Sequence, residues 1–100
     1  MGMLIKVHKA YRDVVSVCDS DLIGKKFEED INLLEVKENF YKGEEKSESD
    51  IIEILIDFAK EDATFNIVGK DSVDCAVKSG LINQNGIKTV QEVPFALVLL

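Results

Sequence analysis

One cysteine and one histidine near the start of the chain have the greatest chemical potential. Cys18 is followed directly by Asp19, and His8 is the single histidine of the sequence. A thiol becomes a useful nucleophile when a base or a positive neighbour favours the thiolate. His8 and Cys18 could therefore form a catalytic or redox pair supported by Asp19. The adjacent carboxylate acts against this pair, because a nearby anion raises the pKa of a thiol.

The pairing of two short strands decides whether this thiol and imidazole can meet. Leu4–Lys9 and Val14–Cys18 are rich in β-branched residues and are separated by four residues, which is typical of a β-hairpin. A four-residue loop pairs His8 with Val15 and places Cys18 on the opposite face. A slip of one residue puts both side chains on one face, close enough to interact. The alternative interpretation of Cys18 is a small, buried apolar residue.

The other candidate ligands indicate no metal site. A single histidine excludes a multi-histidine centre, and Cys18 and Cys75 are far apart in sequence. Asp19-Ser20-Asp21 resembles a carboxylate pair for a cation, but its place after a strand and before Gly24 favours capping of a turn. We therefore predict neither a metal nor a cofactor.

A group of basic residues with one tyrosine forms the best candidate binding surface. Positive side chains contact phosphates and an aromatic ring can stack on a base, so this combination suits RNA. The alternative is that the lysines protect an edge hairpin from aggregation. The group consists of Lys6, His8, Lys9, Tyr11, Arg12, Lys25 and Lys26.

Net charge limits the partners of this surface. The chain of 100 residues has a formal net charge of −7, which argues against non-specific binding to DNA or to anionic membranes. Residues 1–27 hold five bases and three acids, residues 28–62 hold four bases and 13 acids, and residues 63–100 hold three of each. The acidity thus belongs to the central block, and the N-terminal segment is slightly basic.

The length and the apolar pattern predict one soluble domain in the cytoplasm. Residues 1–100 fit a single domain. The longest apolar run, Phe95–Leu100, has six residues, far fewer than the roughly 20 needed to span a bilayer. No secretory signal is apparent. The same run could add an edge strand across a two-fold axis, so a homodimer is a further hypothesis.

The element pattern predicts an α+β fold: a mostly antiparallel sheet with an N-terminal hairpin and two helices packed on one face. A third strand is expected at Ile31–Val36 with both faces at least partly buried, and a final buried strand at Phe95–Leu100. Asn85-Gly86 predicts a hairpin turn. The expected helices are Ser47–Asp62, capped by Ser47, and a shorter one that starts at an Asp71 cap and ends at Ser79 before Gly80.

Several fragments in one order resemble a known family. They are Lys6-Val7-His8, Val17-Cys18-Asp19, Leu22-Ile23-Gly24-Lys25, Leu34-Glu35-Val36, Phe40-Tyr41-Lys42-Gly43, Asn66-Ile67-Val68-Gly69 and the segment Ala76–Ile82. Over residues 4–94 the chain is similar to the archaeal family called domain of unknown function 424. The resemblance implies an archaeal cytosolic protein and transfers no catalytic residue.

The sequence therefore leads to two hypotheses of function. The first is a non-catalytic interaction module that binds RNA or a ribonucleoprotein partner through the N-terminal hairpin. The alternative is a cysteine-based enzyme or redox protein that uses Cys18 with His8.

Overall fold

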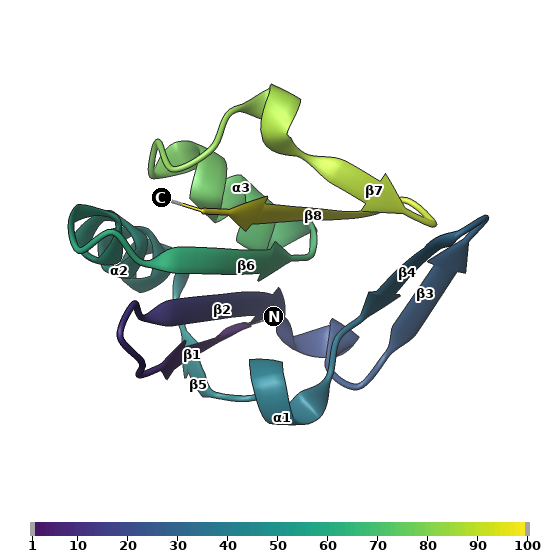
Figure 1. Ribbon diagram of the computed structural model, residues 1–100, viewed down its shortest axis with the longest axis horizontal. Helices are drawn as coiled ribbons and strands as arrows, with labels where there is room; N and C mark the ends of the chain where they lie inside the picture. Colours follow the sequence, from purple (N-terminus) through teal and green to yellow (C-terminus); the bar gives the residue numbers. More distant parts are fainter. Residues whose placement is uncertain (1, 100) are drawn as a thin grey trace.

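A computed structural model describes residues 2–99. These residues form eight strands, three α-helices and two short 3-10 turns (Figure 1). The strands are β1 Met3–His8, β2 Val14–Asp19, β3 Lys26–Glu29, β4 Asn32–Glu35, β5 Glu44–Lys46, β6 Thr64–Val68, β7 Lys88–Val90 and β8 Val93–Val98. The helices are α1 Glu38–Tyr41, α2 Glu48–Lys60 and α3 Lys70–Lys78, and the 3-10 turns are Ser20–Leu22 and Gln84–Gly86.

Six strands form the main sheet in the order β5-β1-β2-β6-β8-β7. All neighbours are antiparallel except β2 and β6, which run parallel at the centre. This arrangement confirms the α+β prediction of a mostly antiparallel sheet with an N-terminal hairpin. Among residues 2–99, no helix is long and apolar enough to cross a membrane.

Helices α2 and α3 both cover one face of the sheet, as the sequence predicts. They share a core with the alternate inward residues of the central strands, such as Val15, Val17, Phe65 and Ile67, which are completely buried. We call this the helix-side core. Helix α2 begins where predicted, because the Ser47 hydroxyl accepts a hydrogen bond from the Asp50 amide, 3.4 Å away.

The opposite face carries α1 and a separate two-stranded sheet made of β3 and β4, which we call the wing. The wing projects to one side of the main sheet (Figure 1). Phe27 and Leu34 pair across it and point into a second core with Cys18 and Val68. This wing-side core covers only part of its face, because Leu97, on the same face in mid-sheet, remains 59% exposed.

The predicted strand Ile31–Val36 is partly right. Leu34 and Val36 are buried as expected, but Ile31 is 98% exposed and Leu33 is 55% exposed. The expectation that both faces are buried is therefore wrong for these two. The reason is that the segment pairs with β3 in the wing, outside the main sheet, and one face of a two-stranded sheet meets solvent.

The predicted Asn85-Gly86 hairpin is also wrong. Gln84–Gly86 is a 3-10 turn capped by Asn83, whose side-chain oxygen accepts a hydrogen bond from the Asn85 amide. The hairpin forms later, between β7 and β8, where Gln91 and Glu92 both have positive φ angles of 50° and 68°. Two positive φ values match the I′ geometry that suits a two-residue hairpin loop.

The C-terminal strand begins earlier than predicted, at Val93, and is less buried. Within it only Ala96 is fully buried, and Leu100 lies outside the described residues. Strand β7 pairs with the first half of β8, Val93–Phe95, whereas residues 96–98 pair on one side only, with β6. This part of the run therefore keeps one open edge among the described residues, and the homodimer stays a prediction.

Candidate functional site

Cys18 lies at the end of β2 and is completely buried in the wing-side core. Burial raises the pKa of its thiol to about 12, and the carboxylates of Asp19 and Asp21 add to the rise. A thiol with this pKa is almost entirely protonated at neutral pH and is a poor nucleophile. The environment of Cys18 therefore matches the apolar-residue interpretation better than the nucleophile interpretation.

The hydrogen bonds of the Asp19 side chain cap a helix that is distant in sequence. One carboxylate oxygen accepts hydrogen bonds from the Ser72 amide at 2.8 Å and the Ser72 hydroxyl at 2.7 Å. The other accepts from the Asp71 amide at 3.1 Å. The free backbone amides of the first turn of α3 thus donate to a side chain of β2, so the prediction that Asp71 caps this helix is wrong. The actual N-cap residue is Gly69, with φ of 109°, and a Cβ there would collide with the Asp19 carboxylate.

His8 lies on the same face of the hairpin as Cys18 but cannot reach it. The strands pair His8 with Val14 and Leu4 with Cys18, one residue off the register expected for a four-residue loop. Lys9 lies outside β1, and its ammonium lies 3.3 Å from the Asp13 carboxylate. The loop between the two strands therefore has five residues, 9–13. Four residues of strand then separate His8 from Leu4, a span of about 13 Å.

The His8 ring packs against α1. It stacks on the Phe40 ring with 4.5 Å between ring centroids, and its Nε2–H donates to the Phe40 carbonyl at 2.9 Å. A carbonyl only accepts, so Nε2 carries the proton and is not available as a base. The buried Ser16 hydroxyl donates to the same carbonyl at 2.8 Å. The three predicted catalytic residues thus have three separate structural environments.

The predicted basic group divides into two parts. Lys9, Tyr11 and Arg12 lie in the loop between β1 and β2, which we call the hairpin tip. Tyr11 is fully exposed there. The Lys9 ammonium lies 5.7 Å from the centroid of the Phe58 ring of α2, which fixes the side of the loop next to the helix.

The second part surrounds α1 and includes a residue that the sequence did not single out. Lys25, Lys26 and Lys37 line a hollow of about 370 Å³, together with Glu35, Glu38 and Asn39. Within residues 2–99 none of these lysines has a carboxylate within ion-pair distance, whereas Glu38 pairs with Lys42. We call this the α1 hollow. Recognition of the β3–β4 hairpin would have revealed Lys37, because pairing of residues 26 and 35 brings the flanking residues together.

Lys6 and His8 connect the two parts. The Lys6 ammonium donates to the Asn39 carbonyl at 2.8 Å, and Asn39 lines the α1 hollow. His8 precedes the hairpin tip in sequence and stacks on Phe40, the neighbour of Asn39. The residues singled out for binding thus follow one path from the hairpin tip, over the His8–Phe40 stack, to the α1 hollow.

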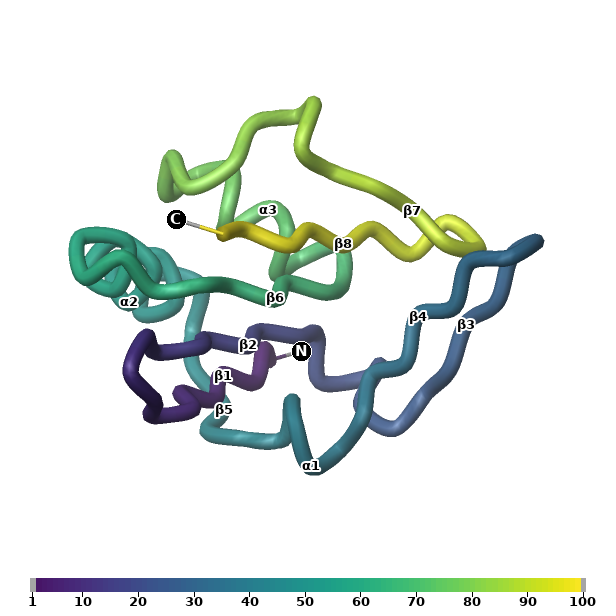
Figure 2. Tube along the Cα trace, in the orientation of Figure 1, coloured from purple at the N-terminus to yellow at the C-terminus, as the bar shows by residue number. Residues whose placement is uncertain are grey.

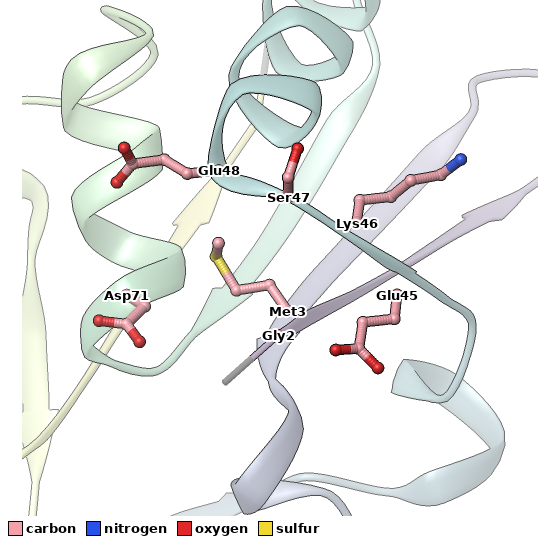
Figure 3. A pocket seen from close by; sticks show the side chains of 7 residues that line it. All are labelled: Gly2, Met3, Glu45, Lys46, Ser47, Glu48 and Asp71. Carbon is pink, nitrogen blue, oxygen red and sulfur yellow. The ribbon is translucent and has the colours of Figure 1, made fainter.

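A larger hollow of about 860 Å³ lies where the first turns of α2 and α3 approach β1, but its polar groups do not converge. Figure 3 shows that Glu48 points toward α3 and Lys46 points the opposite way. The Glu45 carboxylate lies beside Gly2. Glu48 is also paired with Lys78 at 3.1 Å. Within the described chain, no three metal-ligating side chains gather into a cation site.

Comparison with known proteins agrees with this fold. The crystal structure of an uncharacterized conserved protein from Methanopyrus kandleri superposes with a TM-score of 0.86 over 99% of this chain and 93% of that chain, at 21% identity. At that identity the likeness shows a shared fold only. No curated protein gives a significant match. A family model described as protein of unknown function DUF424 matches residues 8–100, which confirms the resemblance found in the sequence. The chain belongs to the DUF424 family.

Proposed function

We propose that this protein is a non-catalytic module that binds single-stranded RNA along the path from the hairpin tip to the α1 hollow. The main support for this proposal is that Tyr11 is fully exposed and lies between Lys9 and Arg12. Large aromatic residues usually bury their rings against apolar neighbours, and the exposed Tyr11 ring has no such packing contact within the described chain. Stacking on an unpaired base would recover that contact.

The charge distribution supports the same partner. The N-terminal 27 residues carry a net charge of +2, whereas residues 28–62 carry −9. Helix α2, which carries Glu53 and Asp57, covers the face of the main sheet opposite to α1 and the wing, and its Phe58 lies beside Lys9 of the hairpin tip. An RNA strand on the path would meet Lys6, Lys25 and Lys37. Phosphate contacts of this kind position the strand, and stacking tolerates any base sequence.

The alternative, a cysteine-based enzyme, has less support. Its nucleophile would be Cys18, whose sulfur is buried and whose pKa is raised to about 12. Its base would be His8, whose Nε2 already donates to the Phe40 carbonyl at 2.9 Å and which lies about 13 Å along the strand from Leu4, the partner of Cys18. Neither group meets the needs of thiolate chemistry.

The proposal is tested by fluorescence anisotropy with a labelled single-stranded oligoribonucleotide at several salt concentrations. Tyr11→Ala should weaken binding about fivefold to 100-fold, the range measured for loss of one stacked base. Tyr11→Phe keeps the ring and should bind nearly as the parent does. A double-stranded RNA of the same sequence should bind more weakly, because its bases are already stacked.

The phosphate contacts are tested by removing two charges in two different places. Lys25→Gln with Lys26→Gln should lower the slope of log affinity against log salt by about 1.4, which corresponds to two lost contacts. Lys70→Gln with Lys88→Gln removes the same charge on α3 and β7 and should leave that slope unchanged. Equal losses for both pairs, or full affinity in Tyr11→Ala, would contradict the proposal.

A further inference from the structure

The outer face of the wing exposes two large apolar side chains. Ile31 is 98% exposed in the turn between β3 and β4, and Leu33 is 55% exposed on the strand that follows. Leu33 pairs with Glu28, and this pair points away from the core side that holds Phe27 and Leu34. The two exposed residues therefore form a small apolar surface on an element that projects from the main sheet, as Figure 1 shows.

The wing is held in place at both ends, so this surface has a defined shape. At its base, the Gly24 amide donates to the Val36 carbonyl at 2.7 Å and the Val36 amide donates to the Lys25 carbonyl at 2.9 Å. At its tip, the Gln91 amide of the β7–β8 turn donates to the Glu29 carboxylate at 2.8 Å. A two-stranded hairpin alone is marginally stable, so these attachments and its buried face must hold it.

Charge selects the kind of partner that can cover this surface. Residues 28–35 contain four acids and no base, and Glu92 of the neighbouring turn adds a fifth acid. RNA and anionic membranes would be repelled by these carboxylates. A second copy of the chain also carries −7 and gains little from approaching. A positively charged protein surface is the complementary partner.

From these observations we infer that the wing is a docking surface for a protein partner that presents lysine or arginine residues around an apolar pocket for Ile31. Such an arrangement, with an apolar anchor ringed by charges, is the usual anatomy of a small interface. The hairpin tip lies at the other end of the molecule from the wing (Figure 2). The docking surface would therefore leave the hairpin tip accessible, whereas the α1 hollow, lined by Lys26 and Glu35 of the wing, lies at the base of the wing.

The test uses the full chain, labelled with ¹⁵N, and a synthetic peptide made of alternating lysine and leucine pairs. Amide shifts should change for residues 28–33 and 91–92 on titration. Ile31→Ser should weaken binding about tenfold, the loss expected when one buried aliphatic side chain is removed. Ile56→Ser removes an exposed isoleucine from the acidic helix α2 and should change the affinity less than twofold.

Other outcomes decide against the inference. Shift changes spread over α2 as strongly as over the wing, or equal losses in both serine variants, would mean simple attraction of a cation to an acidic protein. Dimers in light scattering that vanish in Ile31→Ser would assign the surface to a second copy. A peptide with serine in place of leucine should bind at least tenfold more weakly, and equal binding would also refute an apolar anchor. None of these measurements involves RNA, so they stand apart from the test of the proposed function.

Discussion

Removal of the Asp19 carboxylate should destabilise the fold more than any surface change. Asp19→Ala deletes a cap that accepts three hydrogen bonds and leaves the fully buried Ser72 hydroxyl without its partner. Loss of a helix cap costs about 1 kcal/mol. Leaving a buried donor unsatisfied adds about 2 kcal/mol. The expected total is about 3 kcal/mol, which lowers the melting temperature of a domain of this size by about 12–24 °C.

The measurement is thermal and urea unfolding followed by circular dichroism. Asp21→Ala, which removes an exposed carboxylate two residues later, is the control and should change stability by less than about 0.5 kcal/mol. In the double variant, Ser72→Ala removes the orphaned hydroxyl, so Asp19→Ala with Ser72→Ala should be no less stable than Asp19→Ala alone. A loss for Asp19→Ala as small as that for Asp21→Ala would refute the reasoning, and so would strictly additive effects in the double variant.

Three further predictions concern the thiol and the turns. Burial raises the pKa of Cys18 to about 12 from an ordinary 9.0, so the folded state binds the proton more tightly. The contribution of Cys18 to stability should therefore be constant below pH 9 and be lost as pH rises from 9 towards 12. Cys75 and Tyr41, whose pKa values are also raised, add to the fall, so Cys18→Ala should reduce its slope in pH-dependent urea unfolding without abolishing it. Gly69→Ala should cost more stability than Gly80→Ala in the same assay: both glycines have positive φ, but only a Cβ at Gly69 meets a neighbouring carboxylate. Gln91→Asn with Glu92→Gly should raise stability by about 1 kcal/mol, because both residues have positive φ in a turn that prefers Asn-Gly, and an unchanged urea midpoint would contradict that assignment.

Local signals in the sequence predicted the elements that local chemistry controls. The Ser47 cap and the apolar spacing that follows it placed α2 within two residues of its observed ends. Gly80, with φ of 83°, ends α3 where expected. The β1–β2 hairpin was also predictable, but its register was not. The loop has one residue more than expected, Lys9, which pairs with Asp13, and no pattern of apolar residues indicates that.

The features that the sequence did not reveal depend on distant contacts or on unusual turns. The wing turns at Asp30 and Ile31, without glycine or asparagine, and β3 has one apolar residue. The cap of α3 comes from Asp19, 52 residues before Asp71. Hairpin geometry at positions 91–92 is built from Gln-Glu, which gives no turn signal.

The candidate binding path shows the same division. The basic residues were found from their types, but their separation into the hairpin tip and the α1 hollow depends on the fold. Lys37 joins Lys25 and Lys26 only because β3 and β4 pair. His8 was predicted both as a base and as a binding residue. Its contact with Phe40 joins residues that are 32 positions apart, so no local sequence pattern predicts it.

The parallel pair at the centre of the sheet has a consequence for how the chain assembles. Val14 pairs with Thr64, fifty residues further along, so the middle of the sheet closes only after most of the chain is available. Contacts of such long sequence separation slow folding, because the loop must be ordered before the contact forms. During synthesis the hairpin of β1 and β2 emerges before β6, and the backbone groups on one edge of β2 stay unpaired until β6 follows. The rate-limiting step of folding should therefore be the docking of β6 beside β2.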